Sequence, residues 1–198
     1  MVEGSYVAVI TPFENGKVDK ETFCDLIDFH VRSGTDGLVV AGCTGEAATL
    51  SHTEQKELIS LSVEHSAGRI KIIAGTGSNN TAEALELTQF AEKSGADAAL
   101  LITPYYNKPG PEGQIAHYGT IADACDIPIM LYNVPGRTGT NMLPETITEM
   151  SRRKNIVALK EASPDLDQVS DIIAACDLAV FSGNDSLTLP IISVGGRG

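Results

Sequence analysis

The chain has 198 residues, 42% of them hydrophobic, which is enough for a single globular domain with a buried core. Its 26 acidic residues outnumber its 14 lysines and arginines and give a net charge of −12. This balance argues against a nucleic-acid-binding surface, because phosphates need clustered basic side chains.

Short apolar runs alternate with longer segments of helical spacing along the whole chain. Strands are predicted at residues 6–10, 37–40, 70–74, 98–102, 128–132, 156–159 and 178–181. Helices are predicted between them at residues 20–33, 53–66, 82–94, 114–124, 144–152 and 166–175. Ser51 with Glu54 three residues later forms a capping-box pattern, and Thr81 is the expected cap of the helix that follows it. Repeats of this length are typical of βα units in a parallel α/β fold.

A doubly wound open sheet and a closed barrel both fit this alternation. Polar or small residues follow nearly every predicted strand, and barrel enzymes collect their sites at that end of the strands. The first strand is not followed by the G-x-G-x-x-G pattern of dinucleotide-binding folds. We therefore predict a (β/α)8 TIM barrel that forms one catalytic domain over residues 1–198. Seven strands are expected, with no C-terminal helical extension. The sequence thus has the pattern of a barrel truncated before its eighth strand, with two unpaired edges.

Lys160 is the strongest candidate for a catalytic residue. It directly follows the predicted strand at 156–159, at the mouth of the expected barrel. An apolar setting lowers the pKa of a lysine and leaves a nucleophilic amine, which attacks carbonyl carbons to form imines. The alternative is a lysine at a strand end that reaches into solvent.

Three further features point to the same end of the barrel. Tyr132 ends the preceding strand, where its phenol could transfer protons or be a buried structural residue. Arg137 lies on a loop shaped by proline and glycine, where it could bind a carboxylate or remain an exposed loop arginine. The glycine-containing turn at 42–46 could hold an anion with its backbone amides, although any βα connection needs such a turn.

The remaining polar residues favour neither a metal site nor secretion. The four histidines are far apart and lack the spacing of metal ligands, and the four cysteines form no C-x-x-C pair, so no metal is predicted. The absence of a disulfide framework indicates a cytoplasmic protein. The first residues do not resemble a signal peptide, and no apolar run has the length of a membrane span. We therefore expect no membrane contact.

Six segments together give the chain a family resemblance. They lie at residues 11–13, 42–46, 103–107, 132–139, 160–162 and 182–185. In their order and spacing the chain resembles the N-acetylneuraminate lyase and dihydrodipicolinate synthase family of class I pyruvate aldolases. The resemblance implies that Lys160 condenses with pyruvate without any other cofactor, that the resulting enamine attacks an aldehyde, and that Tyr132 shuttles protons.

The same resemblance assigns roles to the loops. It implies that Thr44 and Gly45 hold the pyruvate carboxylate, and that Gly183 contributes to the substrate site. Cys43 stands where this family usually has a threonine that links two tyrosines. The second of these, Tyr106, is lent across a dimer interface, so a homodimer or homotetramer is expected.

Arg137 resembles the synthase branch of the family. There the arginine meets the carboxylate of aspartate semialdehyde, and the implied product is 4-hydroxy-tetrahydrodipicolinate, on the route to diaminopimelate and lysine. Four residues match positions that bind feedback-inhibiting lysine in sensitive members: His52, Asn79, Glu83 and Tyr105. These four residues could instead simply line a dimer interface. Another pyruvate-dependent aldolase, or a non-catalytic fragment, remains an alternative for the whole chain.

Overall fold

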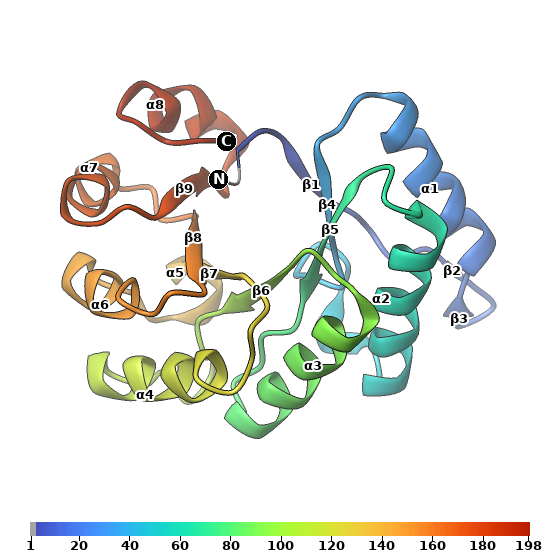
Figure 1. Ribbon diagram of the computed structural model, residues 1–198, viewed down its shortest axis with the longest axis horizontal. Helices are drawn as coiled ribbons and strands as arrows, with labels where there is room; N and C mark the ends of the chain where they lie inside the picture. The colour runs from blue at the N-terminus through green and yellow to red at the C-terminus, as the bar shows by residue number, and fades with distance from the viewer. Residues whose placement is uncertain (1–2) are drawn as a thin grey trace.

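The computed structural model describes residues 3–198, which form a curved sheet of seven parallel strands with helices around its outer face (Figure 1). Each strand of this sheet pairs with the strand of the same sheet that follows it in the sequence. This is the order of a barrel and not of a doubly wound sheet. The strands are β1 (Tyr6–Ala8), β4 (Gly37–Val40), β5 (Lys71–Gly75), β6 (Ala98–Ile102), β7 (Ile129–Asn133), β8 (Ile156–Glu161) and β9 (Ala179–Ser182).

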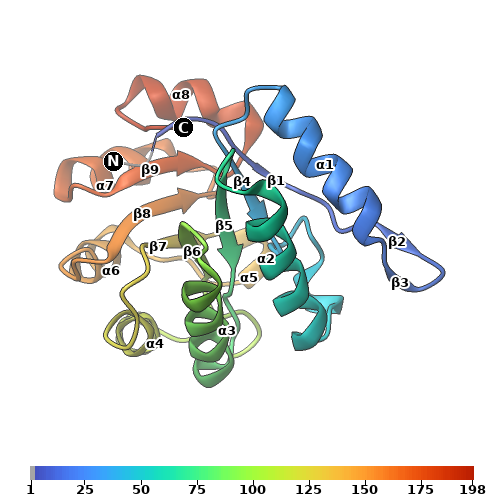
Figure 2. The ribbon, with the colours of Figure 1, turned by 45° about the vertical axis from the view of Figure 1, so that its right-hand side comes forward.

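Seven helices form the outer layer, as both views of the ribbon show (Figures 1 and 2). They are α1 (Lys20–Arg32), α2 (His52–Ser66), α3 (Thr81–Ser94), α4 (Pro111–Ala122), α6 (Pro144–Met150), α7 (Leu166–Ala175) and α8 (Thr188–Ser193). The prediction of an incomplete TIM barrel with about seven βα units is therefore confirmed.

The helix ends follow from local capping chemistry. The Ser51 hydroxyl accepts from the Glu54 amide, and the Glu54 carboxylate accepts from the Ser51 amide, so the predicted capping box of α2 is confirmed. The prediction for α3 is wrong by one residue. Asn80 is its cap, with Oδ1 accepting from the Ala82 amide at 3.0 Å, whereas the Thr81 hydroxyl bonds to His117. Asparagine accepts as well as threonine does at this position.

Alternation along the strands divides the core into two layers. Side chains such as Ile73, Leu100 and Met130 point into the barrel and pack with one another. Their neighbours, such as Leu101 and Leu131, point outward and pack against the helices. Because both faces of the sheet are buried, the strands read as nearly continuous apolar runs.

The sequence predicted two unpaired edges, and these are the outer strands β1 and β9. The last residues of the chain pair with β9, whereas among the described residues their backbone bonds reach only Gly4, just before β1. The Arg197 amide donates to the Val180 carbonyl at 2.8 Å, and the Arg197 carbonyl accepts from the Gly4 amide at 3.0 Å. The rings of Tyr6 and Phe181 also meet edge to face, with centroids 5.6 Å apart. Residues beside the two strands thus bridge them in a way that apolar periodicity could not reveal.

Several short elements lie outside the predicted pattern. A hairpin of β2 (Phe13–Glu14) and β3 (Lys17–Val18) precedes α1, and its turn places Asn15 and Gly16 at positive φ. Three short helices follow strands at the carboxyl end of the sheet: η1 (Ala47–Thr49), α5 (Pro135–Thr138) and η2 (Asp185–Leu187). Within residues 3–198, no helix is both long enough and apolar enough to cross a membrane.

Candidate active site

Lys160 lies near the carboxyl end of β8, inside the barrel. Its neighbours in the sheet register are Tyr132 on β7 and Phe181 on β9. The lysine Nζ lies 4.6 Å from the centroid of the Tyr132 ring. Burial lowers the pKa of Lys160 and the Arg137 cation lowers it further, against the opposing effects of Cys43 and Asp185. This environment favours the neutral amine that a nucleophile requires.

Tyr132 lies beside this amine, and only 5% of it is exposed. Burial raises the pKa of Tyr132 to about 12; the Cys43 thiol raises it as well, and Arg137 opposes the shift. The phenol therefore keeps its proton at neutral pH and can donate it. Because Cys43 raises the pKa of both Lys160 and Tyr132, these three predicted residues lie near one another.

The turn at 42–46 has the form of an anion-binding loop. The Gly45 carbonyl is fixed by the Thr11 hydroxyl at 2.7 Å, and Glu46 adopts a left-handed conformation with φ of 56°. Among the described residues, the amides of Thr44 and Gly45 donate to no other protein group. Free amides in such a turn suit a carboxylate.

Arg137 lies exposed on α5, the single helical turn that follows β7. In the part of the chain that the structure describes, its guanidinium forms no ion pair. A planar cation without a protein partner is available for a carboxylate of a ligand.

A cavity of about 420 Å³ joins this region to a second group of polar residues. Cys43, Tyr132 and Arg137 line one part of it, and His52, Glu83 and Tyr105 line another. One predicted substrate residue, two predicted catalytic residues and three of the four predicted regulatory residues therefore face one cavity. The remaining predicted residues are not in its lining: Lys160, Thr44, Gly45, Gly183, Asn79 and Tyr106.

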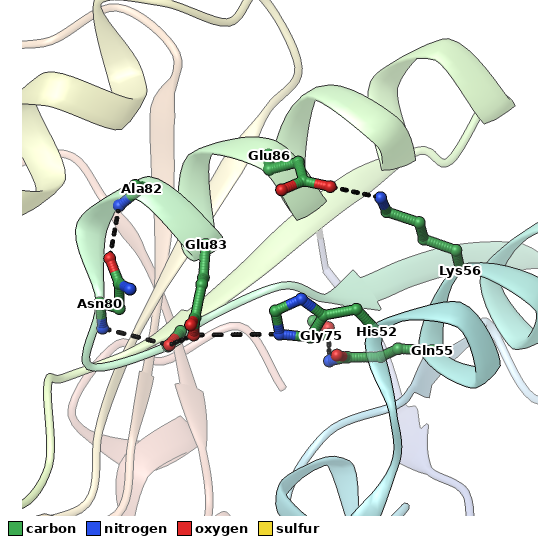
Figure 3. Close-up of polar contacts among 9 residues, drawn as sticks. His52, Gln55, Lys56, Gly75, Asn80, Ala82, Glu83 and Glu86 are labelled. Carbon is green, nitrogen blue, oxygen red and sulfur yellow. Dashed lines mark hydrogen bonds and ion pairs between the residues drawn. The ribbon is translucent and has the colours of Figure 1, made fainter.

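Glu83 and His52 point toward one another across the second part of the cavity (Figure 3). The Glu83 Oε2 accepts from the Ser78 hydroxyl at 2.9 Å and lies 3.9 Å from the His52 Nε2. Gln55 is turned aside, with its Nε2 donating to the Gly75 carbonyl at 3.2 Å. The carboxylate is half-exposed, which leaves it open to a cationic ligand.

The segment after β6 positions the two tyrosines differently. Tyr105 is half-buried in the cavity wall, and its carbonyl accepts from the Asn79 side chain at 3.2 Å. Tyr106 is 89% exposed and has a φ of 70°, which is an uncommon backbone conformation for a large side chain. It thus lies in solvent and does not line the cavity of its own chain.

One residue beside the site, Asp185, was not assigned from the sequence. Asp185 is close enough to Lys160 to raise the pKa of its amine, and its place just after a strand end was the available signal. Gly183 packs so tightly that a Cβ there would collide with Ala162, so its role in the structure is close approach between β8 and β9. Nowhere in residues 3–198 do three or more metal-ligating side chains gather.

TIM-barrel enzymes carry their sites at the carboxyl ends of the strands, and a lysine amine in that place can form a Schiff base with a carbonyl substrate, as in lyases of the aldolase type. The model of the dihydrodipicolinate synthetase family matches residues 1–198, and the chain belongs to that family. It is similar to the 4-hydroxy-tetrahydrodipicolinate synthases of Citrifermentans bemidjiense and Syntrophobacter fumaroxidans, with 52% and 53% identity. Each match covers 100% of this chain and 69% of the relative. The chain is an enzyme of pyruvate condensation in lysine and diaminopimelate biosynthesis.

Solved structures of synthases superpose closely. Dihydrodipicolinate synthase from Aquifex aeolicus matches with a TM-score of 0.98 at 46% identity, over 100% of this chain and 68% of that one. The synthase of Acinetobacter baumannii, complexed with pyruvate, matches with a TM-score of 0.97 at 43% identity, over 100% and 69%. The synthase of Cyanidioschyzon merolae, with lysine bound, matches with a TM-score of 0.95 at 45% identity, over 98% and 68%.

Proposed function

We propose that Lys160 carries the condensation as a Schiff-base nucleophile. The observation that carries this proposal is the half-buried Lys160, whose amine lies 4.6 Å from the centroid of the Tyr132 ring at the carboxyl end of a barrel strand. The pyruvate complex of the Acinetobacter baumannii relative supports pyruvate as the substrate that enters first.

The steps follow from the chemistry of an imine. The neutral amine adds to the keto carbon of pyruvate to form a carbinolamine, whose hydroxyl takes up a proton and leaves as water to give an iminium ion. Loss of a methyl proton gives an enamine, whose terminal carbon bonds to the aldehyde carbon while the aldehyde oxygen takes up a proton. Tyr132, protonated at neutral pH, supplies and recovers these protons, and Cys43 completes the path beside it. The iminium nitrogen is the electron sink, so we propose no metal or organic cofactor.

The carboxylates are held by two different groups. The free amides of the Thr44–Gly45 turn receive the carboxylate of pyruvate, and the Thr44 hydroxyl adds a donor there. Arg137 receives the carboxylate of L-aspartate 4-semialdehyde as the second substrate. The amino group of the semialdehyde then adds to the iminium carbon and displaces the Lys160 amine, which closes the ring and releases 4-hydroxy-tetrahydrodipicolinate. Gly183 contributes by letting β9 approach β8 beside the lysine.

Tyr106 supports an oligomer in which two chains complete each other's sites. The Tyr106 side chain is 89% exposed on a strained backbone, and its burial against a partner chain would stabilise the oligomer. We propose a homodimer, or a homotetramer built from such dimers, in which the Tyr106 phenol joins the proton path of the neighbouring chain.

Lysine is the proposed feedback inhibitor, bound at the second part of the cavity. Glu83 offers a half-exposed carboxylate to an ammonium group, with His52 facing it and Tyr105 beside it in the cavity lining; Asn79 fixes the Tyr105 backbone. The lysine complex of the Cyanidioschyzon merolae relative supports this choice of ligand. All four cysteines are free thiols, which supports a reducing cytoplasmic location.

Borohydride trapping tests the imine. The chain is incubated with pyruvate and borohydride, and the adduct is located by intact mass and peptide mapping. A reduced pyruvyl adduct on Lys160 is expected, and the same treatment of Lys160→Met should give none. An adduct on another lysine, or none in the unchanged chain, would overturn the Schiff-base proposal.

A further inference from the structure

The outward-facing side chains behind Lys160 and Tyr132 form a buried polar ring. Its members are Asn133, Asn141, Glu161 and Gln168, from the ends of β7 and β8, the segment before α6, and α7. Asn133 and Glu161 are wholly buried. The Asn133 Nδ2 donates to Asn141 at 2.7 Å and to both Glu161 oxygens at 3.0 and 3.1 Å. Gln168 closes the ring with Nε2 donating to Glu161 at 3.2 Å.

Backbone amides fix the direction of every hydrogen bond in this ring. The Met142 amide donates to the Asn133 Oδ1 at 3.0 Å, so the Asn133 Nδ2 must face the ring. The Ser163 amide donates to the Glu161 Oε1 at 2.6 Å. The Glu161 Oε2 receives both Asn133 and Gln168, so each oxygen at position 161 must be an acceptor. A carboxylate meets this requirement, whereas an amide would set an N–H against two other donors.

The ring joins the two halves of the proposed site. Asn133 ends β7 and also binds Asn141 and Met142, so it clamps both ends of the 134–142 segment that carries Arg137. Glu161 directly follows Lys160 on β8 and binds the same clamp. We propose that Glu161 is a positioning residue that sets the place of Arg137 relative to Lys160. This inference rests on the roles proposed above for those two residues.

Glu161→Gln is the first test. It should raise the KM for aspartate semialdehyde about 10- to 100-fold, because a displacement of about 1 Å costs this much in a reacting geometry. Borohydride labelling of Lys160 at saturating pyruvate should persist, since the amine itself is untouched. If Glu161→Gln does not fold, the half-buried Asn141→Ala removes a milder part of the ring and should raise the same KM about three- to tenfold.

Moving the carboxylate within the ring should restore part of the site. In the Glu161→Gln, Gln168→Glu double variant, the carboxylate now carried at position 168 accepts from the new amide at position 161 and from Asn141. This removes one of the two donor–donor contacts of Glu161→Gln, while the contact with the Asn133 Nδ2 remains. The KM for aspartate semialdehyde should therefore fall clearly below that of Glu161→Gln without reaching the original value. Gln168→Glu alone brings two carboxylates to where Gln168 and Glu161 now lie 3.2 Å apart, and should be worse than either.

Asn155→Asp is the matched control. The Asn155 side chain donates to the carbonyls of Ala122 and Cys125 at 2.9 and 2.8 Å, just before β8 begins. The substitution should lower Tm and leave both KM values unchanged. A ring variant that behaves like this control, or a double variant no better than Glu161→Gln, would overturn the positioning role. Loss of labelling in the unchanged chain would instead count against the Schiff base.

Discussion

Arg137→Leu separates substrate binding from folding. Arg137 is exposed and unpaired among the described residues, so the change should alter the free energy of unfolding by no more than about 0.5 kcal/mol. A bidentate pair with a carboxylate contains two charge-assisted hydrogen bonds, each worth about 1.5–3 kcal/mol. Solvent exposure places the sum near the lower end, at about 3 kcal/mol, which is roughly a hundredfold in affinity.

The assay is steady-state kinetics with pyruvate and aspartate semialdehyde varied in turn. The KM for aspartate semialdehyde should rise roughly a hundredfold, while the KM for pyruvate changes little. Arg152→Leu is the control, because Arg152 is also exposed but pairs with Glu149 at the end of α6. An unchanged KM for aspartate semialdehyde in Arg137→Leu would refute the assigned role of the arginine.

The same substitution has a second effect, on pH dependence. The Arg137 cation lowers the pKa of Lys160, so its removal raises that pKa and leaves less neutral amine at a given pH. In Arg137→Leu, the acidic limb of the pH profile for the rate of adduct formation should therefore move to higher pH. Arg137→Lys keeps the charge but loses the planar fork, so it should raise the KM without moving this limb. A limb that moves equally in both variants would refute the electrostatic explanation.

Three further substitutions test the other residues. Lys160→Met should abolish the pyruvate adduct and raise Tm, because it removes an amine whose pKa is lowered by burial. This gain in stability is full below the native pKa of Lys160 and disappears as the pH rises through the ordinary pKa of lysine. A lower Tm at neutral pH would contradict it. Cys43→Thr should preserve or raise kcat, since a hydroxyl is the better hydrogen-bond donor and acceptor, whereas a large loss of kcat would give the thiol a role of its own. Glu83→Gln should weaken lysine inhibition by about tenfold or more in inhibition assays. Glu86→Gln is the control and should not weaken it, because Glu86 pairs with Lys56 outside the cavity. Equal effects of the two substitutions would contradict a role for Glu83 in the lysine site.

Strong periodicity made the barrel predictable, and weak or short signals account for what was missed. The apolar runs gave all seven strands of the sheet, but β8 continues through Glu161, two residues beyond its predicted end. Hydropathy stops at Leu159 because the next two side chains are charged, although they extend the same strand. The β2–β3 hairpin was missed despite an Asn15-Gly16 turn, which is a strong hairpin signal, because its strands have only two residues each.

Residue type identified candidates for chemistry but not their spatial relations. The motif at 160–162 pointed to Lys160, while its buried neighbour Glu161 received no role from the sequence. The ring around Glu161 depends on Asn141 and Gln168, which come from separate segments and share no motif. The cavity that joins Arg137 to Glu83 likewise depends on the pairing order of the strands, which local patterns do not contain.

One irregularity in the sheet explains why Lys160 faces the barrel interior. Along β7 and β8 the register pairs Ile129 with Ile156 but Met130 with Ala158, so one extra residue of β8 is accommodated at that point. With a continuous register Tyr132 would lie beside Leu159. Because neighbouring strands point paired side chains to the same face, the lysine amine would then face the helix layer. The bulge therefore places Lys160 beside Tyr132 on the inner face and Glu161 beside Asn133 on the outer face, so that one strand end supplies both the nucleophile and the ring that positions it.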